Sequence, residues 1–169
     1  MKRYLYVLTV LMLAIVMCGC GSKNDEDTGK PVVLRYNGED IYLDEVYIYA
    51  ETVRESYEEK YGTDVWKQSI QSYDGLEINA VDAAKREAIS KLIKTKTLIT
   101  KSGEYGISLT TSEQKEQEKA AQEFYDILTD EQINKVGLEE PTVARVLCES
   151  ALADKIYSYI MKQSSTEIS

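Results

Sequence analysis

The apolar residues of this chain follow two different spacings, and the change occurs near residue 44. Residues 32–34 and 41–42 are short apolar runs on either side of Asn37 and Gly38. An Asn-Gly pair between apolar runs favours a hairpin with a type I′ turn, because both residues tolerate a positive φ. Beyond residue 44 the apolar residues recur every three or four positions, which is typical of helices. The expected core faces include Val46, Ala50 and Val53 in the first helix and Ala84, Ala88 and Leu92 in the second. The pattern predicts a mainly α fold, a multi-helix bundle with a small N-terminal β-hairpin.

Turn and cap residues place the limits of the expected helices. The expected helical segments are 44–61, a short one within 63–72, 79–104, 110–128, 129–136 and 141–162. Asn79 is a plausible N-cap, Thr110 with Glu113 has the spacing of a capping box, and Thr129 is expected to cap the short helix that follows. Gly106 and Gly137 stand where a glycine commonly follows a helix.

The last expected helix carries two apolar faces. One includes Val143 and Val146, and the other consists of Cys148, Leu152 and Ile156 at four-residue intervals. A helix that is apolar on two sides is usually packed between neighbours. The second stripe is therefore either core or a surface on which a partner docks.

The first twenty residues have the features of an export signal. Lys2 and Arg3 precede an apolar run of residues 4–17, and Gly19 stands before Cys20. A positive head, a short apolar run and a small residue describe a secretory signal peptide. The end of the run resembles the lipobox of bacterial lipoproteins, although Met17 stands where leucine is usual. That resemblance implies that Cys20 receives a diacylglyceryl group and becomes the new N-terminus.

The chain accordingly divides into four segments. They are the lipoprotein signal peptide 1–19, the lipidated cysteine with a flexible tether 20–31, a helical domain 32–162, and a frayed C-terminus 163–169. Residues 21–30 contain no apolar side chain, so they cannot bury enough surface to order themselves.

Charge narrows the range of partners. The full chain has 20 Lys and Arg against 29 Asp and Glu, a net charge of −9, and removal of residues 1–19 leaves 18 against 29, or −11. Binding to nucleic-acid phosphates depends on cationic side chains, so no nucleic acid is expected as a partner. Anionic headgroups would also repel this surface, so the membrane is expected to be contacted through the lipid anchor only.

Composition also excludes several kinds of catalytic site. The chain has no histidine, which rules out Ser-His-Asp triads, Cys-His dyads and histidine metal sites. Its glycines are scattered, so no glycine-rich phosphate loop exists. Cys148 is the one thiol left after processing, and with no histidine to activate it an inert core thiol is expected. The carboxylate pairs Glu58-Glu59 and Glu139-Glu140 and the run 25–27 are interpreted as solvated. No cofactor, metal or enzymatic activity is expected.

The order of these pieces resembles the N-terminal domain of SurA-type and PrsA-type extracytoplasmic foldases. The resemblance covers residues 32–162. Its motifs are Tyr-Asn-Gly-Glu at 36–39, Leu-Ile-Lys-Thr-Lys-Thr-Leu-Ile at 92–99, and Tyr-Gly-Ile-Ser-Leu-Thr at 105–110 followed by Glu113. The resemblance implies a chaperone module for exported polypeptides. Many family members carry a parvulin-type isomerase domain before the closing helix, but residues 136–141 leave no room for one.

Tyrosines are the main candidates for client contact. The chain has 13 tyrosines and one phenylalanine. Tyrosine combines a large apolar face with a polar tip and little side-chain entropy, which suits adaptable binding surfaces. The residues that could line a client groove are Tyr47, Tyr49, Tyr61, Trp66, Tyr157 and Tyr159; the alternative is that most of them are half-buried packing residues.

The expected function is that of a lipid-anchored, extracytoplasmic, chaperone-like module that holds unfolded or partly folded exported polypeptides without catalysis. A Gram-positive-type cell surface is favoured over a periplasm. One alternative is an interaction subunit that docks to a fixed envelope partner, such as an isomerase-bearing relative, through Cys148, Leu152 and Ile156. A prolyl isomerase is the other alternative, and the missing parvulin domain and histidines oppose it.

Overall fold

The computed structural model describes residues 30–71 and 75–167, and it is mainly α-helical with a small N-terminal hairpin, as the sequence predicts. Strands β1 (Val32–Tyr36) and β2 (Glu39–Tyr42) pair antiparallel. Asn37 and Gly38 join them with φ of 50° and 84°, which are the positive angles that a type I′ turn requires. The predicted hairpin is therefore confirmed.

The helices follow in the expected order. They are α2 (Leu43–Tyr61), α3 (Ala80–Ile99), α4 (Ser102–Tyr105), α5 (Thr111–Asp126), α6 (Asp130–Val136) and α7 (Glu140–Glu167), with a 3₁₀ helix η1 (Thr63–Lys67) after α2.

Local cap chemistry sets most of the helix limits. The Asn79 side chain accepts a hydrogen bond from Val81 N at 2.9 Å and so caps α3. Thr110 and Thr129 each form a capping box, on α5 and α6. Gly106 and Gly137 end α4 and α6 in the left-handed conformation. The predicted caps Asn79, Thr110, Thr129 and Gly137 are confirmed, whereas Gly106 ends α4 and not the longer helix that was expected before it.

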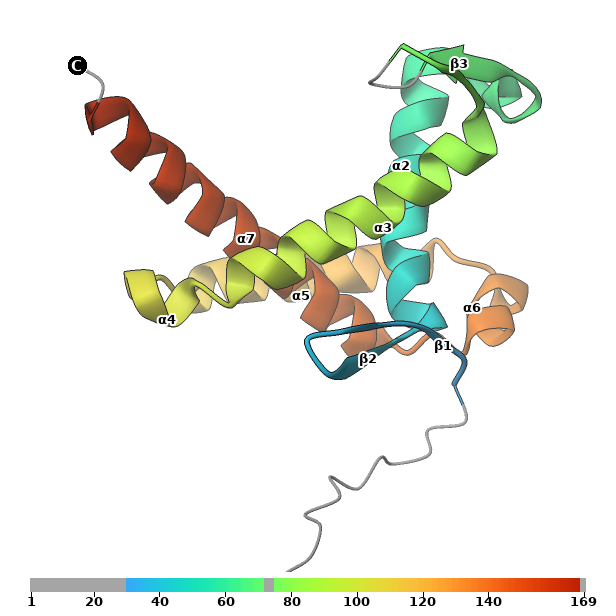
Figure 1. Cartoon of the computed structure of the whole chain (residues 1–169). Helices are drawn as coiled ribbons and strands as arrows, with labels where there is room; N and C mark the ends of the chain where they lie inside the picture. Colours follow the sequence, from blue (N-terminus) through green and yellow to red (C-terminus); the bar gives the residue numbers. More distant parts are fainter. Residues whose placement is uncertain (1–29, 72–74, 168–169) are drawn as a thin grey trace, which may run out of the picture.

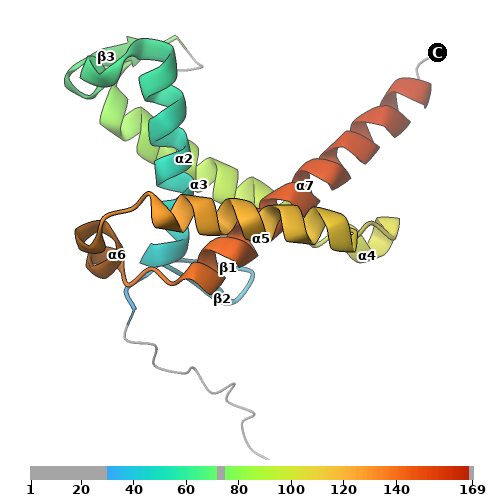
Figure 2. The same ribbon diagram turned by 180° about the vertical axis from the view of Figure 1, so that it is seen from behind.

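Three helices cross at the centre of the molecule, and α7 lies between two others. Figures 1 and 2 show α3 on one side of α7 and α5 on the other, while α2 crosses α3. The hairpin β1–β2 lies at the start of α2 (Figure 1). The last turns of α7 project beyond this crossing in both views.

The core follows from this crossing. Its largest fully buried side chains are Ile48 and Val53 of α2, Val65 of η1, Leu92 of α3, and Val143, Val146 and Ile156 of α7. Because α2 is covered by both α3 and α7, its buried stripe is wider than the apolar spacing suggests. Ile48 and Tyr49 are buried, whereas Val46 and Ala50, which were expected on the core face, are half-buried.

Three segments differ from the prediction. The last helix, expected to end at residue 162 with a frayed end after it, continues to Glu167. Helix was expected within 63–72, but only η1 forms there, and β3 (Ser69–Gln71) then pairs antiparallel with β4 (Glu77–Asn79). Gln68 is extended and Ile70 lies opposite Ile78 across the ladder, so pairing replaces the helix. The helix expected to run to Glu104 ends at Ile99, and α4 is a separate turn.

The export signal lies outside the part of the chain that the structure describes. The residues that it does not describe include Cys20, segment 1–19 and most of the expected tether. Among the described helices, none combines the length and the apolar character needed to cross a bilayer.

Candidate functional site

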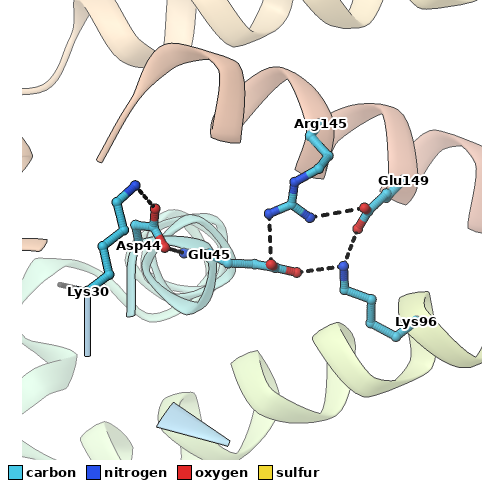
Figure 3. A network of polar contacts seen from close by, with 6 residues as sticks. All are labelled: Lys30, Asp44, Glu45, Lys96, Arg145 and Glu149. Atoms are coloured by element: carbon cyan, nitrogen blue, oxygen red, sulfur yellow. Dashed lines mark hydrogen bonds and ion pairs between the residues drawn. The ribbon is translucent and has the colours of Figure 1, made fainter. Parts of the chain in front are cut away.

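A network of four charged side chains, two of them buried, joins α2, α3 and α7 where they cross. Glu45 contacts Lys96 at 2.8 Å and Arg145 at 2.8 Å, and Glu149 contacts the same two cations at 2.7 and 3.0 Å (Figure 3). The Glu45 side chain is only 4% exposed. Beside this network Lys30 donates to Asp44 at 2.8 Å. The network fixes the angle at which three helices meet, because each cation contacts carboxylates on two of them.

The charged forms of these groups are mutually stabilised. Burial alone would raise the pKa of Glu45, but bonds from Arg145 and Lys96 outweigh burial and hold that pKa below its usual range. Burial would likewise lower the pKa of Lys96, but Glu149 and Glu45 raise it. Glu45 and Lys96 therefore stay ionised at neutral pH. A structural role follows for these four residues.

A pocket of about 320 Å³ opens between α2, α3 and α7, and we call it the three-helix pocket. Ile48, Leu98 and Val146 are among its apolar walls, and Lys94 and Asp154 are exposed residues of its lining. Known ligand sites begin at about this volume. The pocket can therefore accept one or two apolar side chains of another polypeptide.

Tyr49 lines the three-helix pocket with its hydroxyl buried. The residue is 6% exposed, and its hydroxyl has no hydrogen-bond partner among the described residues. The side chains of Thr95 and Ser150, which also line the pocket, lie near this hydroxyl without completing a bond. Burial raises the pKa of Tyr49, so the phenol remains neutral. Tyr49 was a candidate for client contact, and its burial shows that it belongs to the wall of the pocket and not to the outer surface.

Tyr157 stands beside the three-helix pocket. Its side chain is exposed, and Lys94 Nζ, whose side chain lines the pocket, lies 4.3 Å from the centre of its ring. This contact is a cation–π interaction. Met161, one turn further along α7, is also exposed. An apolar client segment that entered the pocket could continue along this part of α7.

The other four predicted client residues lie elsewhere. Tyr47 is half-buried and accepts a hydrogen bond from Gln132 of α6 at 3.1 Å, and burial together with Glu51 raises its pKa to about 12. Tyr61 and Trp66 both contact Tyr57, at ring distances of 5.7 and 5.9 Å. Tyr159 packs on Tyr105 of α4 at 5.4 Å. The six residues therefore do not form one groove, and only Tyr49 and Tyr157 meet at the pocket.

The stripe expected on the last helix does not form a free surface. Ile156 is 0% exposed, so its docking role is wrong and its core role is confirmed. Cys148 and Leu152 are half-buried. Burial, followed by the charges of Glu118 and Glu149, raises the pKa of the Cys148 thiol, which makes it a poor nucleophile. Because α7 lies between α3 and α5, its second apolar face is covered by protein.

Of the carboxylate pairs predicted to be solvated, Glu58 is the clear exception, because its side chain is partly buried and bonded. Glu58 accepts hydrogen bonds from Arg54 at 2.7 Å and from the Trp66 indole at 2.8 Å. Glu139 lies 3.4 Å from Lys30, with its side chain mostly exposed. In the described part of the chain, no group of acidic and cysteine side chains has the arrangement of a metal site.

The charged network was missed by the sequence prediction, although one signal for it exists. Lys96 continues the four-residue spacing of Ala84, Ala88 and Leu92, which places a cation on the buried side of the helix. A buried lysine needs a carboxylate partner. Which carboxylate supplies it depends on how α2 and α7 cross α3, and that information is not local.

Comparisons with protein-family models, with curated proteins and with solved structures found no match to this chain.

Proposed function

We propose that this chain is a lipid-anchored, extracytoplasmic, chaperone-like module that holds unfolded or partly folded exported polypeptides without catalysis. The observation that carries the proposal is the three-helix pocket, which is open to solvent and has Tyr157 beside it. The resemblance of residues 32–162 to the helical domain of SurA-type and PrsA-type foldases supports the same function. Cys20 supplies the anchor in this proposal.

The size of the pocket suits weak and reversible holding. A hollow of about 320 Å³ buries only a few side chains of a client. Little free energy remains from such a contact after a disordered segment has been ordered, so affinities of about micromolar or weaker are expected. Clients would then leave without any energy source.

The first test measures binding of a permanently unfolded protein. The full chain, purified in a mild non-ionic detergent, is titrated with a labelled model protein that has been reduced and alkylated. We expect saturable binding, and we expect Thr52→Trp to weaken it at least fivefold. Thr52 is exposed and lines the pocket, so a large side chain there fills the opening without entering the core.

A matched pair of tyrosines provides the control. Tyr157 and Tyr61 have nearly the same exposure, 42% and 41%, and each has a lysine above its ring, at 4.3 and 4.7 Å. Tyr157→Ala should weaken binding, whereas Tyr61→Ala, far from the pocket, should leave it unchanged. Absence of binding by the native chain, or equal effects of the two substitutions, would remove the pocket from the proposal.

The remaining parts of the proposal have separate tests. Mass spectrometry of the chain from membranes should find Cys20 as a lipidated N-terminus, and an uncut terminus would contradict the anchor. A protease-coupled proline isomerisation assay should show no rate above that of buffer. A measurable rate would contradict the non-catalytic function.

A further inference from the structure

We infer that the outward face of α3 binds a second kind of polypeptide segment, one that carries acidic side chains beside large apolar ones. Two hollows lie here. The first, of about 400 Å³, is bordered by α2, η1 and α3, and the second, of about 500 Å³, lies on α3; Lys85 lines both of them. We call them together the α3 groove. The groove shares no lining residue with the three-helix pocket, so this inference goes beyond the proposed function.

The floor of the α3 groove is apolar. Val81 and Ala84 line the first hollow together with Trp66, and Ile89 and Ile93 line the second. Ile93 is an exposed large apolar side chain in the described structure, and Trp66 is half-buried. Large apolar groups at the base of an open groove favour a partner that brings apolar side chains of its own.

The charges around the groove favour a partner of negative charge. The second hollow is lined by two cations, Lys85 and Arg86, and by no carboxylate. Arg86 has no ion-pair partner among the described residues, and Lys85 has only the exposed Asp82 at 3.9 Å. An exposed pair of that kind contributes little, so both cations remain available to another chain.

The carboxylates of the first hollow do not reverse this preference. Glu51 and Glu58 are each held by Arg54 at 2.7 Å, and Glu58 also accepts the Trp66 indole N–H. Their charge is partly neutralised within the groove. The second hollow, lined by Lys85 and Arg86 without a carboxylate, is unusual in a chain with a net charge of −9. Complementary charge makes acidic segments bind faster and more selectively than basic ones.

The length of the groove limits the size of the segment. From Val81 to Ile93 the helix rises about 18 Å, at about 1.5 Å per residue. An extended chain covers that distance with about six residues, and a helical one with about three turns. A probe of twelve residues therefore spans the groove in either conformation.

The test uses two labelled twelve-residue peptides with the same leucines, one with glutamates at the remaining positions and one with lysines. The full chain in non-ionic detergent should bind the glutamate peptide at least tenfold more tightly. Higher salt should weaken this binding, because the charges are exposed. Trp66 is the only tryptophan of the chain and lines the groove, so its emission should shift when the glutamate peptide binds.

Variants on two helices show where the peptide binds. Arg86→Glu and Ile93→Asp should each weaken binding of the glutamate peptide at least fivefold. The matched controls are Lys119→Glu on α5 and Ile127→Asp after it, because both side chains are highly exposed and distant in sequence from the groove. Far-UV circular dichroism checks that all four variants are folded.

Several outcomes would overturn this inference. They are equal binding of the two peptides, unchanged binding by Arg86→Glu and Ile93→Asp, or an unchanged Trp66 emission. Binding of phosphatidylglycerol vesicles that depends on Arg86 while the peptide fails to bind would assign the face to a lipid surface. Self-association that Arg86→Glu abolishes, again without peptide binding, would assign it to a second copy. Thr52→Trp should not change binding of the glutamate peptide. Failure of this inference would therefore not contradict the proposal for the three-helix pocket.

Discussion

At the scale of single residues, the strongest constraint on this fold is the group of charges at the helix crossing. Glu45 is the least exposed of the four, and it contacts cations on both α3 and α7. Removing water from such charges is costly, and the cost is recovered only when all partners are present. Loss of one member therefore has a larger effect than loss of an exposed pair.

Glu45→Gln tests this difference. The substitution keeps the shape of the side chain but leaves Lys96 and Arg145 with Glu149 as their only carboxylate in the network. We expect the free energy of unfolding to fall by about 3 kcal/mol, as for other broken buried pairs. Urea unfolding followed by circular dichroism measures this change. The control is Glu104→Gln, whose exposed pair with Lys101 should be worth less than about 1 kcal/mol. Equal effects of the two substitutions would contradict the structural role of the network.

The same network predicts how stability depends on pH. The pKa of Glu45 is lowered in the folded state from an unfolded value near 4.5. Between these two pKa values the folded state therefore binds fewer protons at Glu45 than the unfolded state does. The stabilisation is fully present above pH 4.5 and is lost as the pH falls through the lower, folded pKa. Unfolding midpoints measured from pH 7 to pH 3 should therefore fall, with a smaller slope in Glu45→Gln. An identical slope in the variant would show that other carboxylates cause the loss.

The burial of individual residues could be predicted from the sequence only in part. The periodicity identified Ala88 and Leu92 as core, because each helix turn repeats locally. It missed the burial of Tyr49 and Glu45, since both are buried by helices distant along the chain. A tyrosine on the flank of one helix is exposed or buried according to which second helix crosses it, and a single-helix pattern does not contain that information.

At the scale of helices and strands, the correctly predicted features were those that depend on residues close together in the sequence. The turn at Asn37-Gly38 and the caps Asn79, Thr110 and Thr129 depend on residues within four positions of one another. The second hairpin was missed because β3 and β4 have three residues each and no alternation long enough to detect. Both strands also contact α3, which a three-residue pattern does not reveal.

The capping box at the start of α5 gives a prediction at this scale. Thr110 Oγ1 accepts from Glu113 N at 3.2 Å, and Glu113 Oε2 accepts from Thr110 N at 2.6 Å. Thr110→Ala should lower the free energy of unfolding by about 1 kcal/mol, because the first-turn amide loses its acceptor. Thr111→Ala, one residue later and also exposed, should have a smaller effect. Urea unfolding of both variants compares them, and a larger loss from Thr111→Ala would contradict the cap.

At the scale of the whole molecule, α7 performs two tasks along its length. As far as Ile156 it is buried between α3 and α5, and Lys155 joins it to Glu113 of α5 at 2.7 Å. Beyond that point the large side chains Tyr157, Tyr159 and Met161 are exposed, and the last turns of the helix project past the crossing (Figures 1 and 2). One helix therefore closes the core and carries part of the proposed client surface.

A truncation after Ile156 separates the two tasks. The lost contacts are Tyr159 on Tyr105 and Tyr157 with Lys94, each worth about 0.5–1.5 kcal/mol, so the shortened chain should fold with somewhat lower stability. Its binding of the unfolded model protein should fall by at least fivefold. Ala153→Asp is the comparison on the inner part, because a charge at that buried position should destabilise the whole fold. Collapse of the truncated chain would place the outer half of α7 in the folding core, and unchanged binding would confine client contact to the three-helix pocket.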